Sequence, residues 1–127
     1  MRTPVVALLT VATLVWTACA ALAHHSFAMF DTANPIELEG VVKEFKYVNP
    51  HSFIVLEVKE KDGGVTIWNL EGGAPTALAR EGWSKATLKP GDEIKLTIDP
   101  LRSGAPGGAW SPAKIKFKNG EPILIDH

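Results

Sequence analysis

Apolar and polar residues alternate with a period of two through most of the chain after Pro35, which predicts β-strands rather than helices. Ile94, Leu96 and Ile98 are separated by single polar residues and would therefore share one face of a strand. Comparable stretches recur along the rest of the chain. The expected strands cover residues 36–47, 54–59, 65–70, 93–99, 113–118 and 122–125.

Glycine and proline mark the turns between these strands. Asp62-Gly63-Gly64 fits a hairpin turn, because glycine reaches the positive φ angles needed there. In the first strand the apolar pattern slips phase near Gly40-Val41-Val42, which predicts a bulge or bend. Residues 102–112 are rich in glycine and proline, as is typical of a loop.

One segment departs from the alternation. Residues 72–82 predict a short helix, with Pro75 in its first turn and Gly82 at its end. The order of elements is then three strands, a short helix and two strands, followed by a short closing strand. This is the order of a five-stranded Greek-key barrel of the oligonucleotide/oligosaccharide-binding (OB) type. We therefore expect a mostly β, OB-like barrel, with an open β-sandwich as the main alternative.

Residues 1–23 have the pattern of a cleaved signal peptide. Arg2 precedes an almost uncharged apolar run, which ends in the small-x-small sequence Ala21-Leu22-Ala23. A membrane span is one alternative, since the run is nearly long enough, but no cluster of Lys or Arg follows it. Lipid modification of Cys19 is another, although Trp16 fits poorly before a lipoprotein cysteine. We expect cleavage after Ala23 and a periplasmic or secreted protein.

The remaining residues, 24–127, are enough for one domain, with residues 24–34 as an N-terminal arm. Loss of Arg2 with the signal peptide changes the formal net charge from −1 to −2. Because lysines and acidic residues are interspersed, we expect no nucleic-acid partner. The mature chain would contain no cysteine, and therefore neither a disulfide nor a thiolate nucleophile.

Enzyme motifs are missing from the sequence. It contains no G-x-S-x-G elbow, no P-loop and no H-E-x-x-H pair. Most acidic residues fall at solvent positions of the alternation, so no catalytic carboxylate pair is indicated. We therefore expect a non-enzymatic protein whose mature chain has no transmembrane segment.

Histidine is scarce, and its positions suggest a metal site. Cleavage after Ala23 would leave His24 first, and its α-amine and imidazole nitrogen can bind a metal together. A third nitrogen from His25 or His51 would complete a site whose ligands and planar geometry favour Cu(II). The alternative for His51 is a turn residue that only forms a hydrogen bond, and His127 is expected in solvent.

Distance is the main difficulty for a site that joins His24 to His51. A first strand of about 12 residues spans roughly 40 Å. The arm would have to fold back along the barrel to bring the two histidines together. A site formed by His24 and His25 alone, or shared between two chains, avoids this requirement.

A binding surface for a glycan or an envelope protein is the second hypothesis. OB barrels bind ligands at the face of strands 2 and 3 and at the loops that follow strands 1 and 4. The residues expected to contact such a ligand are Tyr47, Asn49, Pro50, Arg102 and Trp110. Trp68 either adds an aromatic side chain to this face or, like Trp83, packs in the core, where large apolar side chains usually lie. A copper-dependent oxidase is a third hypothesis, but the sequence shows neither an open metal position nor a large substrate surface.

Several motifs, in order along the mature chain, resemble a family of small exported bacterial proteins of unknown function. These proteins typically carry HHSF directly after a signal peptide. The resemblance implies a Gram-negative periplasmic setting and no particular activity. The positions of this sequence that match the most distinctive motifs are His24, His25, Asn49, Pro50 and His51.

Overall fold

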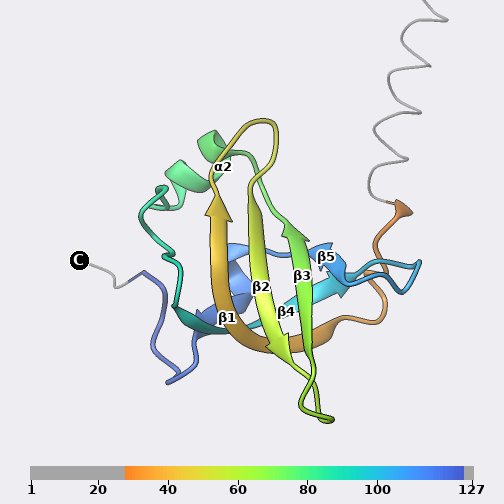
Figure 1. Ribbon diagram of the computed structural model, residues 1–127. Coiled ribbons are helices and arrows are strands. Elements are labelled where there is room, and N and C mark those ends of the chain that lie inside the picture. The colour runs from red at the N-terminus through yellow and green to blue at the C-terminus, as the bar shows by residue number, and fades with distance from the viewer. Residues whose placement is uncertain (1–27, 125–127) are drawn as a thin grey trace, which may run out of the picture.

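The computed structural model describes residues 28–124, so His24, His25 and His127 lie outside the described residues, as does the predicted signal peptide. Within this range the chain forms short strands, one α-helix and one 3-10 turn (Figure 1). The elements are β1 (Ile36–Lys46), β2 (Phe53–Lys59), β3 (Val65–Glu71), α2 (Pro75–Arg80), β4 (Glu93–Pro100), β5 (Gly107–Ala109), η1 (Pro112–Lys114) and β6 (Ile115–Phe117).

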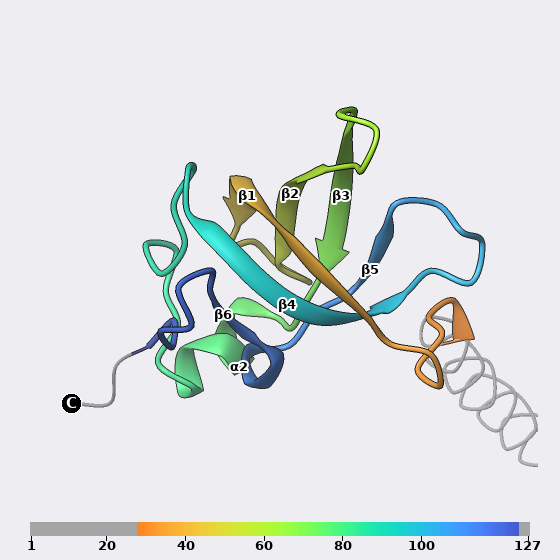
Figure 2. The ribbon, with the colours of Figure 1, turned by 90° about the horizontal axis from the view of Figure 1, so that it is seen from below.

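The sheet closes into a barrel because β1 pairs with two strands. Its C-terminal part is antiparallel to β2, with Phe45 opposite Ile54, and its N-terminal part is antiparallel to β4, with Ile36 opposite Ile98. The ring continues from β2 through β3 and β5 to β4, while β6 extends β4. Figure 2 shows β1 and β4 side by side. This closed five-strand ring, with its short helix between β3 and β4, confirms the expected OB-like barrel.

The barrel interior is filled by the apolar side chains that the alternation assigned to one face. Ile94, Leu96 and Ile98 of β4 are all buried, and they meet Ile54 and Leu56 of β2 in a single core. Burying one such side chain favours the folded state by about 1.5–3 kcal/mol. Hydrophobic burial on alternate strand positions is therefore what fixes the register of the barrel.

The predicted turn and helix are confirmed. Gly63 has a φ of 89°, and the amide of Glu60 donates to the Gly64 carbonyl oxygen at 2.8 Å across the hairpin. The helix α2 begins at Pro75, whose missing N–H is not needed in a first turn. Gly82 follows the helix with a φ of 86°, a conformation that favours glycine.

The irregularity predicted in the first strand lies slightly further along than expected. The register between β1 and β2 shifts between Val42 and Glu44. Gly40 has a different role, since a Cβ atom there would lie 2.3 Å from the carbonyl oxygen of Glu57. A glycine is thus required where β1 passes from its pairing with β4 to its pairing with β2.

The C-terminal third departs most from the sequence-based prediction. The expected loop 102–112 contains β5, and it is glycine-rich because neighbouring strands approach closely. A Cβ atom on Gly108 would lie 2.6 Å from the carbonyl oxygen of Asp99. The expected strand 113–118 is shorter, since η1 precedes β6. Of the expected strand 122–125, the described residues form only an isolated bridge between Lys116 and Pro122.

Over residues 28–124, none of the helices has the length and apolar character needed to cross a membrane.

Candidate functional site

His51 lies at the end of the loop that joins β1 to β2, residues 47–52, which we call the His51 loop. Its Nδ1 contacts Oε1 of Glu71, the last residue of β3. The pairing of β2 with β3 sets Phe53 opposite Glu71 and so holds the carboxylate beside this loop. The His51 side chain is 49% exposed and that of Glu71 30%. Because Nδ1 faces the carboxylate, Nε2 on the opposite side of the ring is the nitrogen available to a ligand.

Asn49 and Pro50 form the exposed turn that precedes His51, and the bond between them is cis. Among the hydrogen bonds of residues 28–124, none involves either residue, so no structural role is assigned to them. Both therefore remain predicted ligand contacts.

Tyr47 has a structural role that the sequence did not indicate. Its hydroxyl donates to the carbonyl oxygen of Pro75 at 2.8 Å and also lies 3.2 Å from that of Trp83. Its ring lies against Phe45, with the centroids 5.8 Å apart. Tyr47 thus ties the His51 loop to α2, while its contact with a ligand stays a prediction.

The prediction of Trp110 as an exposed ligand contact is wrong. The side chain is 5% exposed and belongs to the core. Its ring centroid lies 5.2 Å from that of Trp83 and 6.1 Å from that of Phe45. The reason is the unrecognised strand β5, which continues into Trp110. The Trp110 amide donates to the carbonyl oxygen of Glu71 at 2.8 Å, and the indole lies inside the barrel.

Arg102 is exposed, but its hydrogen bonds are to the N-terminal arm rather than to the His51 loop. Its Nε donates to the Ala28 carbonyl oxygen at 3.0 Å, and its amide donates to that of Met29 at 2.9 Å. Phe30 is buried and forms an isolated bridge with Leu101. The part of the arm in residues 28–31 is therefore held against the end of β4, as both ribbon views show (Figures 1 and 2).

The docked arm fixes the point from which His24 would have to reach His51, which lies beside Glu71 at the end of β3. Phe30 lies beside Leu101, the Leu101 amide donates to the Gly107 carbonyl oxygen at 3.0 Å, and Gly107 pairs with Asn69 of β3. Three strand spacings, about 14 Å, thus separate the arm from β3. Three residues lie between His24 and Ala28, so His24 can reach about 13–14 Å from Ala28 when this segment is extended, a distance comparable to that from the arm to Asn69.

Two ionisable groups outside the His51 loop have shifted pKa values. The Asn34 side-chain amide donates to the Asp31 carboxylate at 3.0 Å and lowers the pKa of Asp31 below its ordinary 3.8, against a smaller opposing effect of burial and with further help from Arg102. The pKa of Lys118 is raised above 10.5 by a hydrogen bond to Glu39 and by the charge of Glu93. Asp31 therefore stabilises the arm in its ionised form.

The described residues do not contain a complete metal site. Among residues 28–124 there is no group of three or more His, Cys, Asp or Glu side chains that could hold a metal ion. His51 could therefore supply only part of the predicted ligand set. The remaining nitrogens would have to come from His24 or His25.

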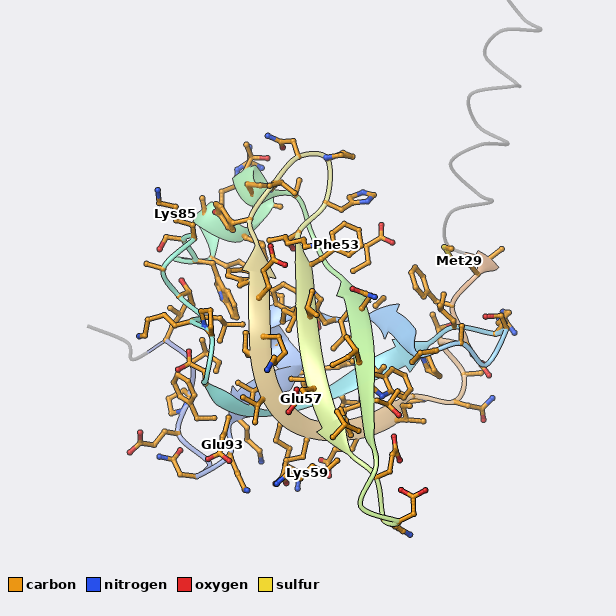
Figure 3. All side chains as sticks on the ribbon, in the orientation of Figure 1. Met29, Phe53, Glu57, Lys59, Lys85 and Glu93 are labelled. Carbon is orange, nitrogen blue, oxygen red and sulfur yellow. The ribbon has the colours of Figure 1, made fainter. Side chains whose placement is uncertain are left out.

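The face of strands 2 and 3, where OB barrels bind ligands, has residues that were not predicted from the sequence. The outward side chains of β2 and β3 form a partly apolar face, which we call the outer face, and Figure 3 labels Phe53, Glu57 and Lys59 along it. Val65 is 52% exposed and Ile67 is 42% exposed on β3. The sequence carried a signal for this face, because β3 has apolar residues at outward as well as inward positions. The residues of the outer face are Phe53, Val55, Glu57, Lys59, Val65, Ile67, Asn69 and Glu71.

Comparison with family models identifies the chain. Residues 11–110 match the model of DUF6152, a family of unknown function. The chain belongs to this family. No match to this DUF6152 chain was found among curated proteins.

Among solved structures, the DUF6152 chain is similar to the crystal structure of Rim1, a mitochondrial single-stranded DNA binding protein from S. cerevisiae. The TM-score is 0.50 at 10% sequence identity, and the match covers 67% of this chain and 93% of Rim1. At this identity the similarity establishes a shared OB-like fold alone.

Proposed function

We propose that the chain is an exported, non-enzymatic binding module of the cell envelope. Its ligand is Cu(II), bound by His51 and by the histidine that becomes the first residue when the signal peptide is cleaved before His24. The contact between His51 and Glu71 is the observation that carries this proposal. Metal-binding histidines commonly direct their second ring nitrogen to a carboxylate, which fixes the ring and strengthens the ligand.

The docked arm supports the same assignment. Hydrogen bonds from Arg102 and the burial of Phe30 hold the chain from Ala28 onward at one end of β4. An amine four residues earlier therefore starts from a fixed point rather than from a free tail. Preorganisation of this kind reduces the entropy lost when a ligand binds.

Single-stranded DNA, which Rim1 binds, is not the ligand we propose. Proteins that bind single strands combine a basic groove with aromatic side chains on which bases stack. The outer face has a single aromatic residue, Phe53, and its one lysine, Lys59, is outnumbered by Glu57 and Glu71. These charges would repel phosphate rather than attract it.

The test is a Cu(II) titration of protein purified from the periplasm, with intact mass to identify the first residue and electron paramagnetic resonance to report the ligands. We expect one equivalent of copper in a nitrogen-rich tetragonal site, with a signal that weakens in His51→Ala and is retained in the control His127→Ala. Affinity no tighter than that of a free His-His peptide, or a mature chain that begins elsewhere, would overturn the proposal.

A further inference from the structure

The N-terminal half of β3 has an open edge. Pairing with β5 covers only Asn69 to Glu71. On that side the Asn69 amide donates to the Pro106 carbonyl oxygen at 3.2 Å, and the Glu71 carbonyl oxygen accepts from Trp110 at 2.8 Å. Since backbone groups alternate in direction along a strand, those of Val65 and Ile67 point to the same side. In the part of the chain that the structure describes, no strand lies beside them there.

This edge also lacks the features by which sheet proteins protect themselves. The segment Val65-Thr66-Ile67-Trp68 contains no proline, no glycine and no charge. Its outward side chains are apolar, with Val65 52% and Ile67 42% exposed. An unprotected, apolar edge strand is a template for another strand.

We propose that this edge pairs with the same edge of a second copy of the chain. In an antiparallel arrangement about a two-fold axis at Thr66, Val65 lies opposite Ile67 of the second copy, and Ile67 lies opposite its Val65. Both pairs exchange two backbone hydrogen bonds, and four apolar side chains meet on the outer face. The segment is thus complementary to itself, as a two-fold interface requires.

The charges beside this segment favour the same arrangement. The β2–β3 register sets Lys59 beside Val65 and Glu57 beside Ile67. In the joined sheets, each row of outward side chains runs from Lys59 and Val65 of one copy to Ile67 and Glu57 of the second copy. The two ends of a row therefore carry opposite charges. A parallel pairing of the same edge would instead turn the two outer faces to opposite sides of the joined sheet, so the apolar side chains of the two copies would not meet. Within its own chain Glu57 also contacts Lys43, with Nζ and Oε2 3.2 Å apart. The border of the interface therefore carries both signs of charge.

The interface is small, because β5 limits it to three or four residues of each β3 strand. Interfaces below about 1,200 Å² are usually weak and transient. The pairing is therefore a reversible dimer that forms as the protein becomes concentrated. It does not depend on copper, and its test can be made on metal-free protein.

Sedimentation velocity over a range of concentrations tests the proposal on the mature protein. We expect dimers toward about 1 mM and a roughly tenfold weaker association in Val65→Lys. The matched control is Val48→Lys, because Val48 is 51% exposed but lies in the His51 loop. It should associate like the wild type. A monomer at every concentration, or equal association in Val65→Lys and wild type, would overturn the proposal.

Amide hydrogen exchange gives a second readout at the edge itself. Exchange of the Ile67 amide should slow as the concentration rises, and Ile67→Pro, which removes this donor without removing a bond to β2, should abolish association. Should Ile67→Pro fail to fold, the Val65→Lys comparison still decides. If the protein stays monomeric while a synthetic Thr-Val-Thr-Val peptide protects the Ile67 amide, the edge serves a peptide strand and the second-copy proposal fails.

Discussion

The indole ring of Trp110 lies directly against the backbone of Gly72. A Cβ atom on Gly72 would come within 2.3 Å of both Cε2 and Nε1 of Trp110. Gly72, the first residue after β3, must therefore lack a side chain so that the tryptophan can enter the core. This contact explains why Trp110, although it follows a glycine-rich segment, is not available to a ligand.

The Gly72→Ala variant should be destabilised by about 1–3 kcal/mol, because overpacking forces the indole or the backbone to move. Urea unfolding followed by tryptophan fluorescence measures the change. The control is Gly73→Ala, since the nearest atoms to a Cβ there lie 3.9 Å away. Equal stability of the two variants would contradict the assignment of Gly72 as a packing position.

Tyr47→Phe should lower the free energy of unfolding by about 0.5–1.5 kcal/mol, because it removes the hydrogen bond to the Pro75 carbonyl oxygen. The aromatic contact with Phe45 is retained in this variant. Thermal unfolding measures the loss, and copper affinity should change little. A variant as stable as the wild type but with weaker ligand binding would instead assign Tyr47 to the binding surface alone.

Glu71→Ala should weaken Cu(II) binding by about 10- to 100-fold, the usual effect of removing a carboxylate that orients a metal-binding histidine. Isothermal titration calorimetry measures the affinity. Glu57→Ala is the matched control, because Glu57 lies on the same outer face but has no contact with His51. If both variants bind copper equally well, the carboxylate has no part in the site.

Asn34→Ala should raise the pKa of Asp31, because the side-chain amide of Asn34 is the main cause of its lowered value. A carboxylate with a lowered folded-state pKa contributes stability above its unfolded value, near 3.8, and loses it as the pH falls through the folded value. The arm of the wild type should therefore stay docked further into acid than that of the variant. Carbon-13 NMR of the Asp31 carboxyl measures its pKa in the wild type and in the variant. An unchanged titration would refute the role of Asn34.

The protein should show no measurable binding to oligo(dT) at physiological salt, because the outer face lacks both a basic groove and a row of stacking aromatics. Fluorescence anisotropy of a labelled oligonucleotide provides the measurement. Salt-sensitive binding that is lost in Phe53→Ala would reassign the outer face to single strands.

Much of the barrel could be predicted from the sequence because burial imposes a period of two on its strands. The alternation in β2 and β4 gave their bounds to within one residue. The strand β5 could not be found this way, because Gly107 and Gly108 are selected by the close approach of Leu101 and Asp99. A glycine that packing requires has the same appearance in sequence as one that a loop permits.

The candidate site was less predictable than the fold. The position of His51 in the loop after β1 followed from the order of strands, but its partner Glu71 lies 20 residues away and meets it only through the β2–β3 register. The burial of Trp110 and the engagement of Arg102 by the arm depend on contacts between distant segments. Such contacts leave no periodic signal in a single sequence.

The double pairing of β1 has a consequence for how the chain matures. Ile36 finds its partner Ile98 only about 60 residues later in the chain. Until β4 has been synthesised, the first strand lacks one of its two neighbours and the barrel cannot close. Contacts this distant in sequence form late and slowly. The barrel can therefore close only when all the residues from β1 to β4, 36–100, are free to fold, so a partly exposed chain has no closed form.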